Sequence, residues 1–254
     1  MITIKSAKEI EHMKEAGRIT AMARAAAVRS VKPGVTTGEI DKVVRETIEK
    51  AGATPSFLGY GGFPGSACVS LNDEVIHGIP SFRRKVQEGD IVKVDVGAYY
   101  QGFHGDCTIT IPCGTVSEEA RKLIDVTRQS FYEGIKFALE GNRISDISHA
   151  VQAYVEQHGF SVVRQYVGHG IGEKLHESPE VPNFGLPGHG VRLRSGMTLA
   201  IEPMVNIGTY DVKVLPDGWT VKTKDGSLSA HYENTVLITD GEPVILTAVD
   251  GEVL

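Results

Sequence analysis

Residues 92–110, VKVDVGAYYQGFHGDCTIT, are typical of two β-strands joined by a tight turn, and each strand carries one aspartate. A turn centred between Tyr100 and Gln101 would place Asp95 directly opposite Asp106 on one face of the hairpin. The apolar neighbours of the aspartates would then point to the other face. Because an unpaired carboxylate out of water is costly, the two aspartates need a partner.

Around this hairpin, a pattern of two helices followed by strands occurs twice. Ser6 and Thr36 are each followed three residues later by a glutamate, which is the sequence signature of a capped helix start. The predicted helices cover residues 6–32, 36–52, 117–141 and 145–159, and further predicted strands cover 68–71, 161–167, 197–205 and 233–239. No linker divides the chain, so we expect a single domain, residues 1–254, with an internal duplication of about 1–112 and 113–254.

The acidic residues of the strands support the duplication. Asp95 and Glu202 each follow a glycine by six residues, and Asp106 and Glu233 each precede a threonine by two. Two-fold symmetry would bring these four carboxylates together, where two divalent cations would neutralise them. The alternatives are carboxylates exposed at strand edges or paired with arginines, although neither hairpin supplies arginines at matched positions. Oxygen ligands with one imidazole suit Mn²⁺, Fe²⁺, Co²⁺ or Zn²⁺.

Three of the nine histidines lie in sequence contexts that favour a binding role. His169 lies between two glycines after a predicted strand, where backbone freedom would let the imidazole enter a cleft. His176 follows seven residues later, and His77 precedes a glycine at a strand end. His231 shares a strand face with Glu233 and is a candidate for contact with the metal ligands. The remaining histidines are expected at the surface: His12, His104, His149, His158 and His189.

Composition excludes several classes of protein. The chain has 254 residues, of which 41% are hydrophobic, and a net charge of −6, which argues against DNA binding. No apolar run is long enough for a membrane span, and charges interrupt the first residues too often for a signal peptide. Three cysteines without disulfide spacing favour a reducing compartment, so we expect a cytoplasmic protein. Strand alternation turns Cys107 away from Asp106, so this thiol is expected in the core.

Several separated segments together resemble the type I methionine aminopeptidases. They include NDEVIHGIP at 72–80, the hairpin itself, GHGIGEKLHESP at 168–179, MTLAIEPM at 197–204 and HYENTVLIT at 231–239. The resemblance implies the pita-bread α/β (α+β) fold, in which two pseudo-twofold related halves form an antiparallel sheet covered by helices. It also implies hydrolysis of the N-terminal methionine from nascent proteins when the second residue is small.

The resemblance implies a role for each site residue. Two divalent metal ions would be bound by Asp95, Asp106, His169, Glu202 and Glu233. Asp106 and Glu233 would bridge both ions, and Glu202 would also carry the proton. His77 and His176 would contact the substrate, and an apolar pocket for the methionine side chain would be formed by Tyr60, Phe63, Cys68 and Trp219, with Phe57 a weaker candidate. Leu175 departs from the family, which usually has phenylalanine there, so packing beside His176 is expected to be looser.

The resemblance also implies partners. These are nascent polypeptide N-termini and the ribosome near its exit tunnel, with a monomeric chain and no membrane. Two other functions remain open at this point. An X-Pro aminopeptidase or prolidase-like hydrolase would share the fold and the metal ions, and a non-enzymatic binding protein would share the fold alone.

Overall fold

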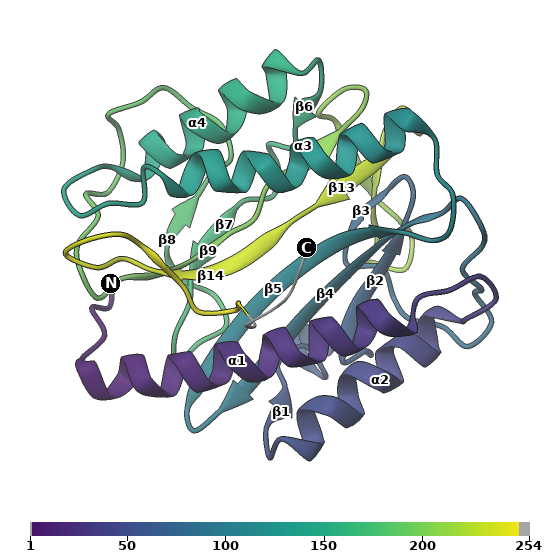
Figure 1. The fold of residues 1–254 in the computed structure, drawn as a ribbon, viewed down its shortest axis with the longest axis horizontal. Coiled ribbons are helices and arrows are strands. Elements are labelled where there is room, and N and C mark those ends of the chain that lie inside the picture. The colour runs from purple at the N-terminus through teal and green to yellow at the C-terminus, as the bar shows by residue number, and fades with distance from the viewer. Residues whose placement is uncertain (1, 249–254) are drawn as a thin grey trace.

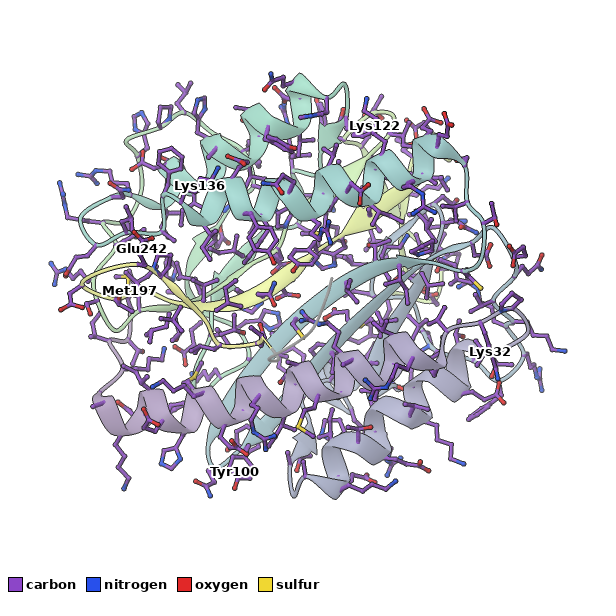
Figure 2. All side chains as sticks on the ribbon, viewed as in Figure 1. Lys32, Tyr100, Lys122, Lys136, Met197 and Glu242 are labelled. Carbon is purple, nitrogen blue, oxygen red and sulfur yellow. The ribbon has the colours of Figure 1, made fainter. Side chains whose placement is uncertain are left out.

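The computed structural model describes residues 2–248; residue 1 and residues 249–254, which the predicted domain includes, lie outside the described residues. Two helix pairs lie side by side over one face of the main sheet (Figure 1). The α-helices are α1 (Ala7–Ser30), α2 (Thr37–Lys50), α3 (Glu118–Ile135) and α4 (Ile144–Gln157), and a short 3₁₀ helix covers Tyr60–Gly62. Side chains fill the space between helices and sheet, whereas Lys122 of α3 and Lys136, the residue that follows α3, are exposed (Figure 2). None of the described helices could cross a bilayer.

Local sequence explains where the first two helices begin. Ser6 caps α1 and forms a capping box with Glu9, and Thr36 forms the same box with Glu39 at the start of α2. Both starts were predicted. The third helix ends at Ile135, whereas the sequence predicted residue 141. From there the chain forms tighter turns, in which the Ala138 N–H donates to the Ile135 carbonyl, three residues back.

The main sheet is antiparallel throughout and runs in the order β1-β4-β5-β14-β9-β7-β8, with β2 also paired to β4 and β15 to β14. Two small sheets have the orders β13-β10-β6 and β11-β12-β3. The strands are β1 (Thr54–Pro55), β2 (Ala67–Leu71), β3 (Glu74–Ile76), β4 (Ile91–Tyr100), β5 (Phe103–Pro112), β6 (Ser161–Val162), β7 (Gly168–Gly170), β8 (Glu177–Val181), β9 (Thr198–Ile201), β10 (Met204–Asn206), β11 (Val212–Val214), β12 (Val221–Thr223), β13 (Ser229–His231), β14 (Glu233–Leu237) and β15 (Val244–Ile245). The two halves meet where β5 pairs with β14.

The register of the β4–β5 hairpin differs from the prediction. The turn is formed by Gln101 and Gly102, both with positive φ, so Asp95 pairs with Thr108 instead of Asp106. The two aspartates are therefore diagonal neighbours. Because the shift preserves strand alternation, both still point to the same face, as predicted.

Two predicted strands are shorter than expected. The strand predicted over 161–167 is limited to β6, and beyond it the Arg164 guanidinium stacks on Tyr210, 4.2 Å from the ring centre. The strand predicted over 197–205 is interrupted at Glu202 and Pro203, since proline has no N–H for the ladder. This interruption places Glu202 between β9 and β10.

The helix-facing side of the sheet is apolar. Val92, Val94 and Val96 of β4 pack in one buried cluster with Ile19 of α1 and Ile40 of α2. Cys107 is fully buried, as predicted for the face opposite Asp106. The carboxylates consequently occupy the other face of the sheet, away from the helices.

Candidate metal centre and substrate cavity

Every residue that the sequence analysis placed in the site lines one cavity of about 150 Å³. The lining consists of Phe57, Tyr60, Phe63, Cys68, His77, Asp95, Asp106, His169, Leu175, His176, Glu202, Trp219 and Glu233. The cavity therefore has an acidic side formed by the sheet and an apolar side formed by aromatic residues.

The acidic side is built from several strands of the main sheet. Asp106 of β5, His169 of β7 and Glu233 of β14 have potential ligand atoms that all lie within 4.8 Å of one another. Glu202 Oε1 is 3.5 Å from His169 Nε2, and Asp95 reaches the same cavity from β4. Residues far apart in sequence thus meet at the junction of the two halves.

The carboxylates are crowded and poorly solvated. Burial, followed by repulsion from Glu233, Asp95 and Glu202, raises the pKa of Asp106 well above its usual range. The pKa values of Glu202 and Glu233 are raised for the same reasons, and burial raises the pKa of Asp95 to about 7. Without cations, the folded chain must therefore hold extra protons at neutral pH.

Unpaired atoms indicate what would complete the site. Asp95 Oδ1, Asp106 Oδ1 and His231 Nε2 are buried and have no hydrogen-bond partner among the described residues. No lysine nitrogen lies within 4.0 Å of the four carboxylates in residues 2–248. Buried polar atoms are normally satisfied, and clustered carboxylates with an imidazole are a donor set for divalent transition-metal cations. The residues present therefore fit a metal centre.

His169 is fixed by its strand, which differs from the prediction of a flexible glycine loop. The histidine lies within β7, and its neighbouring glycines are needed for close packing rather than for positive φ. A Cβ on Gly168 would lie 2.3 Å from the Ala200 carbonyl oxygen, and one on Gly170 would lie 2.4 Å from that of Ser178. The His169 Nδ1–H donates to the Gly170 carbonyl at 2.8 Å, which leaves Nε2 as an acceptor toward the carboxylates.

His231 contacts a candidate metal ligand, as predicted, but that ligand is Glu202. His231 ends β13 of a small sheet, whereas Glu233 begins β14 of the main sheet, so the two residues do not share a strand as expected. His231 as a whole residue is 2% exposed, and its Nε2 is 3.7 Å from Glu202 Oε2. The main chain of His231 is held by Thr110, whose hydroxyl accepts from the His231 N–H and donates to its carbonyl. This imidazole contacts a candidate ligand without lining the cavity.

The opposite side of the cavity is aromatic. Trp219 meets Phe63 edge-on, with ring centres 5.1 Å apart, and the ring of His77 lies 6.3 Å from Trp219. Tyr60 Oη and His176 Nδ1 are hydrogen-bonded at 2.8 Å. Burial lowers the pKa of His77 to about 4 and also lowers that of His176, so both imidazoles are neutral at pH 7.

His104 is not a free surface residue, which corrects the prediction. It lies in β5, where Nδ1 is hydrogen-bonded to Ser56 Oγ at 2.8 Å and the ring packs 4.6 Å from that of Tyr99. Strand alternation puts His104 on the same face as Asp106, a signal the sequence contained. The Ser56 contact anchors the segment that carries Phe57 into the cavity. His149 and His189 are exposed as predicted, whereas His12 and His158 are partly buried.

Comparison with known proteins identifies the family. The model of metallopeptidase family M24 matches residues 11–240. The methionine aminopeptidase of Clostridium acetobutylicum is 56% identical over 97% of this chain and 99% of its own length. Methionine aminopeptidase 1 of Bacillus subtilis is 50% identical over 98% of this chain and all of its own length. The chain therefore belongs to metallopeptidase family M24 and, within it, to the methionine aminopeptidases.

Solved structures agree with this assignment and with the pita-bread fold. The crystal structure of methionine aminopeptidase from Thermotoga maritima superposes with a TM-score of 0.97 at 48% identity, covering 98% of this chain and all of that one. The prolidase of Pyrococcus furiosus superposes with a TM-score of 0.78 over 97% of this chain and 66% of that one, and at 24% identity this likeness shows the fold alone. The resemblance drawn from the sequence motifs is confirmed.

Proposed function

We propose that this chain is a metal-dependent aminopeptidase that releases the N-terminal methionine of new polypeptides when the second residue is small. The observation that carries the proposal is the cavity itself, which places a cluster of four carboxylates and His169 opposite an aromatic wall. A thioether side chain is apolar and packs favourably against aromatic rings. The X-Pro alternative is not favoured, since relatives at 50–56% identity over nearly the whole chain are methionine aminopeptidases.

We propose Asp95, Asp106, His169, Glu202 and Glu233 as ligands of two divalent cations, drawn from Mn²⁺, Fe²⁺, Co²⁺ and Zn²⁺. Asp106 and Glu233 would be shared by both cations; their potential ligand atoms lie within 4.8 Å of each other and of that of His169. When bound, such cations supply a Lewis acid for the scissile carbonyl and lower the pKa of a water molecule. The unpaired oxygens of Asp95 and Asp106 support this ligand set.

The protein's own groups orient the substrate and move the proton. His169 keeps its proton on Nδ1, so that Nε2 remains free to bind a cation. His176 uses Nδ1 for Tyr60 and presents Nε2 to the substrate, and neutral His77 can donate one hydrogen bond and accept another. Glu202, with an imidazole near each carboxylate oxygen, is the group proposed to take the proton from the attacking water.

Tyr60, Phe63, Cys68 and Trp219 form the proposed pocket for the methionine side chain. Cys68 is 5% exposed and pairs with Asp95 across β2 and β4, so its thiol lies where the apolar and acidic sides of the cavity meet. Burial and the nearby carboxylates raise the pKa of this thiol, which keeps it protonated and uncharged. A neutral thiol is compatible with an apolar pocket.

The test is release of methionine from Met-Ala-Ser with added Mn²⁺ or Co²⁺, compared with hydrolysis of Ala-Pro. We expect release from Met-Ala-Ser only, a strong loss of activity for His176→Ala, and no loss for His189→Ala, which changes an exposed histidine. Absence of release with any of the four metals would refute the proposal. Hydrolysis of Ala-Pro alone would favour the X-Pro alternative.

We further propose that the chain acts as a cytoplasmic monomer on nascent polypeptide N-termini, near the ribosomal exit tunnel. The three cysteines are free thiols, which is compatible with a reducing compartment. We also propose that the chain is one catalytic domain derived by duplication of about 1–112 and 113–254. In each part, a helix pair precedes the strands that carry the carboxylates. Sedimentation velocity would test whether the chain is a monomer, and co-sedimentation with ribosomes would test whether it binds near the exit tunnel.

A further inference from the structure

Lys93 is a buried cation that the proposed reaction does not use. It lies in β4 two residues before Asp95, on the same face of the sheet, and its residue exposure is 1%. Its Nζ donates to two main-chain carbonyls, that of Asn72 at 2.8 Å and that of Ser229 at 2.6 Å. Among the described residues, no carboxylate oxygen lies within 4.0 Å of this nitrogen. The ammonium group is therefore held by carbonyl dipoles alone.

A lysine in this position needs an explanation beyond stability. Removing an ammonium group from water is costly, and an apolar side chain of similar size would often fill such a space at least as favourably. Burial lowers the pKa of Lys93 to about 7. Even the neutral amine keeps two N–H groups, enough for both carbonyls. The contacts thus persist in either protonation state. Their effect is to fix the positions of the Asn72 and Ser229 carbonyls relative to β4.

The two carbonyls belong to segments that lead directly into the cavity. Asn72 lies in the turn between β2 and β3 with a φ of 53°, and β3 ends immediately before His77. Ser229 begins β13, which ends at His231, two residues before Glu233. The Ser229 N–H also donates to the Asn72 carbonyl at 3.1 Å. One side-chain nitrogen therefore joins β4 to the segments that carry His77 and Glu233.

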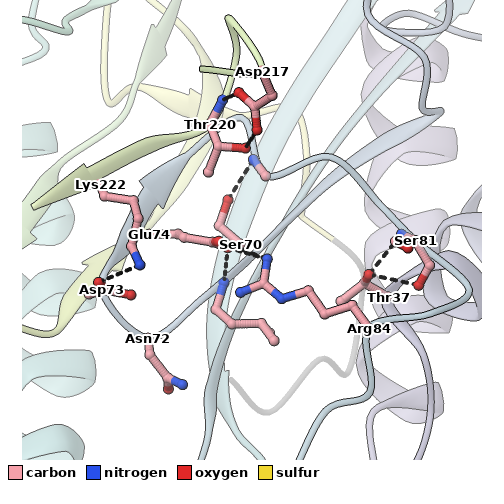
Figure 3. Close-up of polar contacts among 12 residues, drawn as sticks. Thr37, Ser70, Asn72, Asp73, Glu74, Ser81, Arg84, Asp217, Thr220 and Lys222 are labelled. Atoms are coloured by element: carbon pink, nitrogen blue, oxygen red, sulfur yellow. Dashed lines mark hydrogen bonds and ion pairs between the residues drawn. The ribbon is translucent and has the colours of Figure 1, made fainter. Parts of the chain in front are cut away.

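The same β2–β3 turn is held on its outer side by a separate ion pair. Asp73 and Lys222 of β12 are 2.7 Å apart and partly exposed, with Asn72 nearby on the other side of the turn (Figure 3). The neighbouring Glu74 pairs with Arg84 (Figure 3). Lys222 therefore offers a control: it is a lysine that contacts the same turn but reaches no residue of β13.

We propose that Lys93 is a positioning residue, whose side-chain nitrogen holds the segments bearing His77, Asp95 and Glu233 in the geometry required for cation and substrate binding. The proposal rests on the proposed function of the cavity. It predicts that the two carbonyls lose their shared partner in Lys93→Met. Both segments, still joined to each other by the Ser229 N–H bond to the Asn72 carbonyl, then loosen from β4.

The test compares Lys93→Met with Lys222→Met in the full chain. For Lys93→Met we expect faster hydrogen exchange confined to residues 72–77 and 229–233, and Mn²⁺ affinity lowered by about tenfold or more. The kcat for Met-Ala-Ser should fall together with kcat/KM. Lys222→Met should leave Mn²⁺ affinity and kcat/KM within about twofold of the unmodified chain. Exchange and Mn²⁺ affinity do not depend on the substrate, so failure of the unmodified chain to release methionine would count against the proposed function alone.

A rescue experiment separates positioning from general destabilisation. Lys93→Ala leaves space for a small ammonium ion, so methylammonium chloride should restore part of the Mn²⁺ affinity and activity, measured against sodium chloride at equal ionic strength. Tetramethylammonium, which has no N–H, should restore nothing. Should Lys93→Met fail to fold, Lys93→Ala refolded with methylammonium takes its place. The proposal is overturned if Lys93→Met keeps Mn²⁺ affinity and kcat/KM within about twofold, if exchange rises over the whole chain, or if methylammonium restores nothing.

Discussion

Replacing Asp106 by asparagine should have opposite effects on the metal-free and the metal-loaded protein. In the metal-free chain, ligand oxygens of Asp106 and Glu233 lie within 4.8 Å of each other, and Asp106 Oδ1 has no hydrogen-bond partner within residues 2–248. Two unit charges at that separation repel by about 3.5 kcal/mol at an effective dielectric constant of about 20. Proton uptake relieves part of this repulsion in the unmodified chain. We therefore expect metal-free Asp106→Asn to be more stable by roughly 1–3 kcal/mol, or roughly 2–10 °C in Tm.

Bound cations should reverse this order of stability, so that the unmodified chain becomes more stable than Asp106→Asn. The unmodified chain gains about 2.7 kcal/mol when the free cation concentration is 100 times Kd, and the variant gains much less because asparagine offers a neutral oxygen to a bridging position. Release of methionine should fall by at least about 100-fold, with the fold intact. Asparagine is neutral and nearly isosteric with aspartate. The variant therefore separates the electrostatic cost of the carboxylate cluster from its role in binding cations.

The assay is urea unfolding followed by circular dichroism, first with a chelator and then with Mn²⁺, together with methionine release from Met-Ala-Ser. Asp125→Asn is the matched control, because Asp125 is an exposed aspartate on α3 and should change neither quantity. If metal-free Asp106→Asn is less stable than the unmodified chain, the inference that the carboxylates repel one another is refuted. A variant with undiminished activity would refute the bridging role.

Three further outcomes follow from the same structure. The folded pKa of Asp95, raised from 3.8 to about 7, means that the native state binds more protons than the unfolded state; metal-free stability should therefore fall as pH rises through that window, measured by urea midpoints in chelator. Lys5→Met should cost about 3–5 kcal/mol in urea unfolding, because it leaves the Glu177 carboxylate, whose side chain is 10% exposed, without its cation, whereas Lys5→Met with Glu177→Leu should recover most of the loss. Gly168→Ala should abolish Mn²⁺ binding in calorimetry by forcing β7 from β9, whereas Gly241→Ala, where a Cβ meets only ordinary contacts, should bind normally.

Features determined by short sequence separation could be predicted from the sequence. The starts of α1 and α2 follow from side chains that cap the backbone three residues away, as at Ser6 and Glu9. Strand alternation alone places Asp95 and Asp106 on one face, and this result survives the error in register. Acidic residues at matched positions in apolar strands then indicate a cation site before any contact is known.

The hairpin register required the tertiary structure. Gln101 and Gly102 form a turn that the sequence does not mark strongly, since glutamine is not a typical residue for positive φ. In the observed pairing Gly97 lies opposite Asp106, and a Cβ on Gly97 would lie 2.7 Å from the ring of Phe57. The lack of a side chain at Gly97 therefore lets an aromatic residue of the cavity pack against β4 beside the carboxylates.

By itself, the sequence determined the helix starts, the faces of the strands, the residue types of the site and the family. Only the tertiary structure decided which groups touch. Lys93 donates hydrogen bonds to main-chain carbonyls 21 and 136 residues away in sequence, and Ser56 is hydrogen-bonded to His104, 48 residues away. A main-chain carbonyl is the same in every residue and leaves no mark in the sequence. Contacts of this kind are therefore set by how the strands and turns pack, which no local pattern encodes.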